Sequence, residues 1–110
     1  MTVNDVCRII DAKPVCGELS KSFDGVYIGD LLSRAMSHVE SDNLWVTIMS
    51  NVNVVAVATL TEPAAIILAE GVELQDDALD GARKNQITVI STELSAYEIA
   101  VKLHQAASEM

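Results

Sequence analysis

Aromatic side chains are scarce in this chain. Only four of its 110 residues are Phe, Tyr or Trp, although half of the residues are hydrophobic. The core must therefore be built from Val, Ile, Leu and Ala. Such a core is typical of parallel sheets whose strands are covered by helices on both faces. A chain of this length forms one domain.

Basic residues are scarce as well. Seven Lys and Arg residues stand against sixteen Asp and Glu residues, which gives a formal net charge of −9. Such a chain offers no basic face to a phosphate backbone, so the composition argues against a nucleic-acid partner. The simplest role of the acidity is solubility, and the alternative is a protein partner with a basic surface.

Long apolar runs and targeting signals are also missing. No apolar stretch reaches about 18 residues without a polar interruption, so the sequence predicts no membrane span. The opening segment MTVNDVCRII lacks both the basic and the apolar region of a signal peptide, and we expect a cytoplasmic protein. Cys7 and Cys16 are too few for a disulfide scaffold, so both are interpreted as buried thiols.

Apolar runs alternate with helical stripes along the chain. β-Branched and aliphatic runs predict strands near 13–16, 44–49, 64–69 and 87–91, with a few extended residues around 26–28. Helical spacing predicts helices over about 3–10, 30–39 and 73–84, and Ser95 with Glu98 forms a capping box for a final helix. The sequence thus predicts a single α/β domain over residues 1–110, with a largely parallel sheet of about four to five strands flanked by helices.

The segment SNVNVVAVATLT at 50–61 fits a strand by composition but not by length. Continuing the strand at 44–49 through Leu60 would make about 17 residues, or roughly 55 Å. A domain of this size has a radius of gyration of only about 13 Å. The chain must therefore turn near Ser50 and Asn51, and we predict a buried crossover helix that one of these two residues caps.

Polar residues follow three of the predicted strands. Ligands of open α/β sheets bind outside the carboxyl ends of the strands, and Gly71 permits a sharp turn there. Glu70 would repel a bare phosphate, so a neutral or cationic ligand, or the sugar and base of a nucleotide, fits better. Ordinary turns and caps are the simpler explanation of each residue. The candidate ligand-binding residues are Ser50, Asn51, Asn53, Glu70, Gly71, Ser91 and Thr92.

Catalytic and metal-binding motifs are absent. The sequence contains no GxxxxGK[ST], GxGxxG, GxSxG or HExxH. His38 and His104 have no Cys or carboxylate at a recognisable metal-ligand spacing, so we predict neither metal nor cofactor. A catalytic role would require Cys16 to fold close to Glu70. We therefore expect a protein that is not an enzyme.

Four segments carry a family resemblance: GVYIGDLLSRAM, LWVTIM, AAIILAEG and ITVISTELSAYEIA. Over about residues 4–103 they resemble the DRTGG domain family, and most closely its small stand-alone members associated with iron-only hydrogenase gene clusters. The resemblance implies a fold like the N-terminal domain of HPr kinase, a regulatory role, self-association and a protein partner from a hydrogenase-related system. It brings no catalytic residue. The family motifs Gly-Asp-Arg and Thr-Gly-Gly are replaced here by SNVN at 50–53 and by Ala69-Glu70-Gly71, so only Gly71 matches.

Two functions remain open at this point. The first is a non-catalytic regulatory or assembly module that forms a homodimer and binds a protein partner. The second is a small-ligand sensor that uses the carboxyl ends of the strands. For the homodimer, the crossover helix is apolar on nearly all sides, and one layer of sheet covers only one of them. We therefore predict a dimer interface formed by Trp45, Val52, Val54, Val55 and Leu60.

Overall fold

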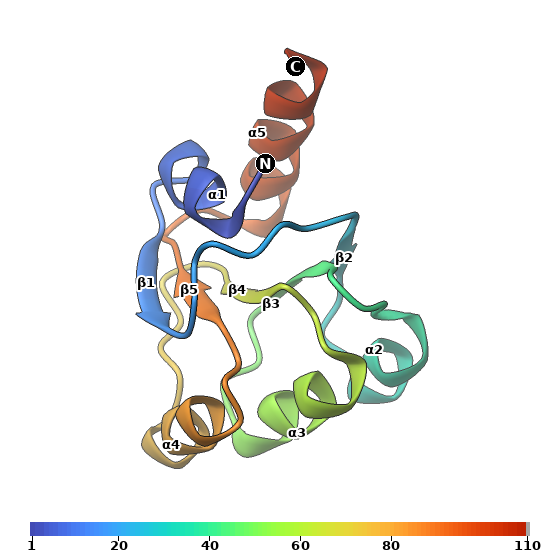
Figure 1. The fold of residues 1–110 in the computed structure, drawn as a ribbon, viewed down its shortest axis with the longest axis vertical. Helices are drawn as coiled ribbons and strands as arrows, with labels where there is room; N and C mark the ends of the chain where they lie inside the picture. Colours follow the sequence, from blue (N-terminus) through green and yellow to red (C-terminus); the bar gives the residue numbers. More distant parts are fainter. Residues whose placement is uncertain (110) are drawn as a thin grey trace.

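Five strands form one sheet in the computed structural model, which describes residues 1–109 (Figure 1). The strands follow the order β1-β5-β4-β3-β2. Strands β2 to β5 are parallel, whereas β1 runs antiparallel to β5 at the edge. The predicted α/β class with a largely parallel sheet is confirmed. The strand bounds are β1 (Lys13–Cys16), β2 (Val26–Ile28), β3 (Leu44–Thr47), β4 (Ala65–Leu68) and β5 (Val89–Ser91).

Helices cover the two faces of this sheet (Figure 1). One face carries α1 (Val3–Ile9) and α5 (Ala96–Ser108), and the other carries α2 (Leu32–His38), α3 (Val52–Thr61) and α4 (Asp76–Lys84). The buried side chains fall into two clusters, one between the sheet and each helix layer. None of the helices in the described part of the chain is long and apolar enough to span a bilayer.

The central strands β3 and β4 are buried along their whole length. Trp45 and Ile66 enter the cluster under α2, α3 and α4, whereas Val46 and Ile67 enter the cluster under α1 and α5. Side chains of a strand alternate between its faces, so a strand buried on both faces is apolar at every position. This explains the continuous aliphatic runs that the sequence shows.

Side-chain caps fix where three helices begin. Thr2 with Asp5 and Ser95 with Glu98 form capping boxes at the starts of α1 and α5. At the start of α3 the Asn51 side chain accepts the N–H of Asn53 at 3.1 Å. The predicted crossover helix and its cap are thus confirmed. Capping also lowers the pKa of Glu98, because the backbone N–H of Ser95 donates to the carboxylate.

Helix α3 packs between α2 and α4, so helices of the same chain lie against its apolar sides (Figure 1). Val54 and Val55 are buried against the rest of the single chain, and Trp45 is completely buried beneath α3. The neighbouring helices therefore cover the sides that the apolar pattern of α3 assigns to a second copy. Of the five predicted interface residues, only Val52 and Leu60 are exposed.

Residues 17–25, the crossing segment, join the two outer strands of the sheet (Figure 1). Because β1 and β2 lie at opposite edges, this segment passes over the ends of the strands between them, on the side where the parallel strands begin. The Lys21 carbonyl accepts the N–H of Val3 at 2.9 Å, and the Glu18 carbonyl accepts the hydroxyl of Thr88 at 2.8 Å. These bonds tie the segment to α1 and to the start of β5.

Replacing Trp45 tests the packing of α3. Its side chain is completely buried, and its Nε1–H donates to the Gly29 carbonyl at 3.1 Å. We expect Trp45→Ala to lower the free energy of unfolding by about 3–5 kcal/mol, because the change leaves a large cavity and an unpaired carbonyl. Urea unfolding followed by circular dichroism measures this. The exposed Gln105→Ala control should stay within about 0.5 kcal/mol of the parent protein, and equal values for the two variants would contradict the packing.

The cap of α5 predicts a dependence of stability on pH. The pKa of Glu98 lies below its ordinary value of 4.5 in the folded chain, so its stabilising contribution is complete above that value. The contribution is lost as the pH falls through the folded pKa. Glu98→Gln keeps an acceptor for the Ser95 N–H but cannot titrate. We therefore expect its free energy of unfolding to fall less than that of the parent between about pH 6 and pH 3. Equal losses would show that the cap does not contribute.

Candidate functional site

The parallel strands β3, β4 and β5 end at one edge of the sheet, called the carboxyl edge, as expected. The sheet hydrogen bonding continues past these ends, since the Ala69 N–H donates to the Thr47 carbonyl at 3.1 Å and the Thr92 N–H donates to the Leu68 carbonyl at 2.9 Å. The Asp30 carboxylate accepts the Thr47 hydroxyl at 2.7 Å. Backbone and side chains therefore close much of this edge.

Two consecutive left-handed residues make the sharp turn after β4. Glu70 has φ 60° and Gly71 has φ 71°. Their N–H groups donate to the carbonyls of Leu94 and Thr92, both at 2.9 Å. A Cβ atom on residue 71 would lie 2.4 Å from a carboxylate oxygen of Glu93. The backbone angle of the turn therefore favours glycine at position 71, whereas the exposed Glu93 side chain could move away from a Cβ atom.

A small cavity of about 120 Å³ lies beside this turn. Of the seven predicted ligand-binding residues, Gly71, Ser91 and Thr92 line it. The charged residues around it are Asp11, Lys13, Glu73 and Glu93. Sequence reasoning missed Lys13 because it pairs with Ser91 only through the antiparallel direction of β1. Side-chain periodicity is the same for both strand directions, so no signal in the sequence places Lys13 here.

The other predicted ligand-binding residues do not line this cavity. Asn51 caps α3, Asn53 is exposed in the first turn of that helix, and the Ser50 carbonyl accepts an N–H from the start of α4 at 3.0 Å. Glu70 is exposed. Even Thr92, which does line it, uses its buried hydroxyl to donate to the Ile10 carbonyl at 2.8 Å. Several polar groups at the strand ends, those of Ser50, Asn51 and Thr92, therefore form hydrogen bonds within the fold.

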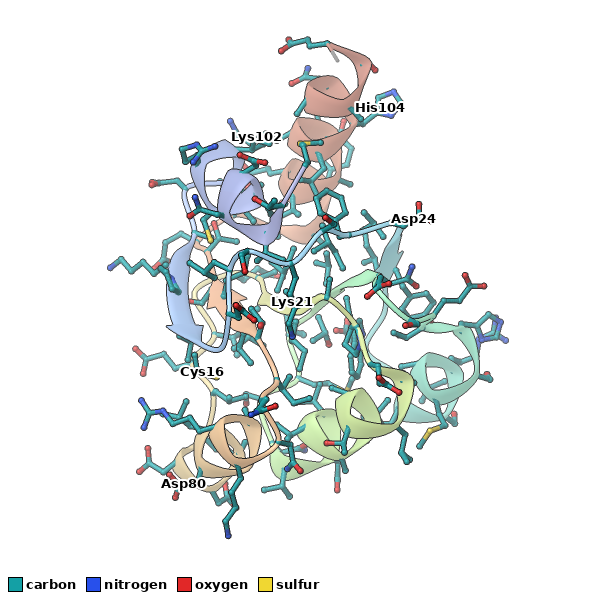
Figure 2. All side chains as sticks on the ribbon, in the orientation of Figure 1. Cys16, Lys21, Asp24, Asp80, Lys102 and His104 are labelled. Carbon is teal, nitrogen blue, oxygen red and sulfur yellow. The ribbon has the colours of Figure 1, made fainter. Side chains whose placement is uncertain are left out.

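Cys16 lies at the opposite edge of the sheet from Glu70. It ends β1 and pairs with Val89 at the beginning of β5, because β1 is antiparallel (Figure 2). Its thiol donates to the Ile87 carbonyl at 3.3 Å, and burial raises its pKa above the ordinary value of 9.0. A neutral thiol far from the carboxyl edge removes the one catalytic arrangement that the sequence left open.

Metal ligands do not gather anywhere in residues 1–109. No group of three His, Cys, Asp or Glu side chains is arranged there to hold a metal ion. The one ion pair of the same residues joins Arg8 to Asp5 within α1.

The profile of the DRTGG domain family matches residues 5–106. The chain belongs to the DRTGG domain family. This confirms the resemblance to the DRTGG family that the sequence shows. No curated protein sequence matches the chain.

Among solved structures, the chain is similar to the CBS and DRTGG domains of the regulatory region of Clostridium perfringens pyrophosphatase, complexed with its activator diadenosine tetraphosphate. The TM-score is 0.76 at 13% sequence identity. The match covers 96% of this chain and 46% of that one, so this chain spans less than half of its length. At this identity the likeness shows a shared fold.

Two glycine substitutions should act in opposite directions. Gly71→Ala places a side chain at a left-handed position, and we expect it to lower the free energy of unfolding by about 1–2 kcal/mol. At Gly81, inside α4, a Cβ atom would lie 3.6 Å from Cγ1 of Val55, an ordinary contact. Gly81→Ala should therefore raise the free energy of unfolding by about 0.5–1 kcal/mol. Urea unfolding measures both, and a stabilised Gly71→Ala variant would contradict the turn.

Proposed function

We propose that this DRTGG domain is a non-catalytic regulatory module that acts by self-association, and that two copies meet through an apolar surface beside β2. The observation that carries the proposal is the exposure of Val26 and Ile28, which are 43% and 45% exposed although they lie on a sheet face. We call this surface the β2–α5 surface. It consists of Val26, Ile28, Ile48 and Tyr97.

The pairing of β2 with β3 fixes where these side chains point. Val26 lies beside Leu44, and Ile28 lies beside Val46. Leu44 and Val46 are completely buried in the cluster under α1 and α5. Val26 and Ile28 therefore point to the same side of the sheet, but at its outer strand no helix layer buries them. Ile48 follows two residues after Val46 and is 45% exposed.

Helix α5 contributes Tyr97 to this surface. Figure 2 shows His104 pointing away from α1, on the side of the molecule that carries β2, whereas Lys102 points toward α1. Tyr97 precedes His104 by seven residues, which places both on the same face of the helix. The Tyr97 side chain is 78% exposed. The aromatic ring of Tyr97 and the aliphatic side chains of Val26, Ile28 and Ile48 are all exposed and all uncharged.

A second copy is the occupant that this surface favours. Covering one half-exposed aliphatic side chain stabilises a complex by about 1 kcal/mol, and a two-fold axis makes each such side chain count twice. None of these four side chains carries a charge that contact would desolvate. The copies repel one another through a net charge of −9 each. Salt screens that repulsion, so the dimer should tighten as the ionic strength rises.

The acidic faces remain free in such a dimer for a protein partner with a basic surface. Helix α4 carries Asp76, Asp77 and Asp80, all exposed, and Figure 2 shows Asp80 pointing away from the sheet. Charge attraction would favour this partner, and salt would weaken its binding. The two associations therefore respond to salt in opposite directions, which separates them experimentally.

The alternative of a small-ligand sensor has support from the nucleotide activator that the pyrophosphatase region binds. The cavity at the carboxyl edge measures only about 120 Å³, whereas small-molecule sites usually occupy about 300–1,000 Å³. The carboxyl edge, where the sequence predicts the ligand site, therefore offers little room for such a ligand.

Paired substitutions test the proposed interface. We expect Ile28→Asp to raise the dissociation constant of the dimer at least about tenfold, since it places a charge in an apolar contact. Leu60→Asp is the matched control, because Leu60 is a 68% exposed apolar residue on α3. Its dissociation constant should equal that of the parent. Sedimentation equilibrium measures both, with circular dichroism to confirm folding.

The control also tests the other apolar face. A dimer that Leu60→Asp breaks and Ile28→Asp leaves intact would move the interface to α3. A parent protein that stays monomeric at high concentration and physiological salt would refute self-association altogether.

A further inference from the structure

The edge where the parallel strands begin, called the amino edge, holds larger cavities than the carboxyl edge. Two cavities of about 370 Å³ each lie there, against about 120 Å³ at the carboxyl edge. Lys21 and Gln86 line both of them, so the two cavities adjoin, and together they are called the amino-edge groove, with each cavity one lobe. We infer that this groove binds a small zwitterion of the amino-acid class. The inference is independent of the proposed dimer.

The first lobe is suited to the anionic end of such a ligand. Lys21 of the crossing segment and Arg83 of α4 line it, with Glu18 as its one carboxylate. Neither Lys21 nor Arg83 forms an ion pair in the described residues. In a chain with seven basic and sixteen acidic residues, two bases against one acid stand out. Ammonium and guanidinium groups together bind a carboxylate through charge-assisted hydrogen bonds.

The second lobe is suited to an ammonium group. Asp42 and Glu62 line it, one from the turn between α2 and β3 and one from the turn between α3 and β4. The Asp42 N–H donates to the Glu62 carbonyl at 3.0 Å, which holds the two turns together. Helix α3 ends at this lobe without a basic residue in its last turn. The partial negative charge of the helix end adds to the two carboxylates, so this lobe sets two carboxylates and a helix end against the single ammonium group of Lys21.

Lys21 and Gln86 connect the two lobes. The backbone of Lys21 is held by the hydrogen bond of 2.9 Å that its carbonyl accepts from the Val3 N–H. Figure 2 shows Lys21 near the middle of the molecule. The Gln86 amide can donate to a carboxylate and accept from an ammonium group. A zwitterion that spans the groove would thus meet a matching group at each end and an adaptable amide between them.

Ligands of a single charge fit the groove less well. A plain anion would face Asp42, Glu62 and the end of α3 in the second lobe. A plain cation would face Lys21 and Arg83 in the first. Opposite charges at the two ends of one small molecule satisfy both lobes, and this charge complementarity selects the amino-acid class.

Nuclear magnetic resonance titration of the ¹⁵N-labelled chain tests the inference, with each of the common L-amino acids at millimolar concentration as the probe. We expect at least one of them to shift the amide signals of Lys21, Asp42, Glu62 and Gln86. The N-acetylated and the carboxamide forms of that amino acid each lose one charge, so each should bind at least about tenfold more weakly.

Variants of each lobe complete the test. Lys21→Met, or Arg83→Gln if the first variant does not fold, should weaken the bound amino acid about tenfold, and Glu62→Gln should do the same. Lys13→Met is the matched control, because Lys13 lines the carboxyl-edge cavity. Its affinity should equal that of the parent.

Four results would overturn the inference. The first is the absence of any shift with all the amino acids. The second is a set of shifts confined to the carboxyl edge around Ser91. The third is equal binding of the N-acetylated or carboxamide form. The fourth is inorganic phosphate that shifts the amino-edge signals as strongly as the best amino acid, since this would make the groove a plain anion site.

Discussion

Burial of β3 and β4 on both faces is the constraint on which the rest of this fold depends. Strands whose side chains are hidden on both sides need a helix layer on each side, and parallel neighbours need long crossovers to return the chain. The helices α2, α3 and α4 serve as these crossovers and form one layer. The other layer must come from the ends of the chain, which supply α1 and α5. Joining α1 and β1 to β2 then requires the crossing segment.

The sequence predicts those parts of the fold that depend on local chemistry and on length. The crossover helix α3 follows from the excessive length of a continuous strand, and Asn51 and the Ser95–Glu98 box mark helix starts through hydrogen bonds to their own neighbours. Strand direction and neighbours are different, because periodicity does not encode them. This is why the sequence does not place Cys16 and Lys13 in the sheet, and why it predicts Trp45, Val54 and Val55 at a dimer interface although they are buried inside one chain.

The two edges of the sheet differ because the chain closes them differently. At the carboxyl edge the tight turn at Glu70 and Gly71 folds back onto the segment after β5 through two backbone hydrogen bonds, which leaves little open volume. At the amino edge the crossing segment is held by hydrogen bonds to α1 and to the start of β5. A cavity remains open between this segment and the turns that precede the strands. Polar residues at strand ends can be recognised in a sequence, but the space beside them depends on where the crossing segment passes.

The pairing of β1 with β5 has a consequence for how the chain is made. These strands lie near opposite ends of the sequence, so a ribosome releases Lys13–Cys16 long before Val89–Ser91 exists. Until then the early strand has no neighbour in the sheet, and α1 lacks the helix α5 that it packs against. The parallel strands β2 to β4 can assemble during synthesis, whereas the outer edge and one helix layer must wait for the last residues. Nascent chains of this protein therefore expose an apolar sheet face, the kind of surface that chaperones recognise.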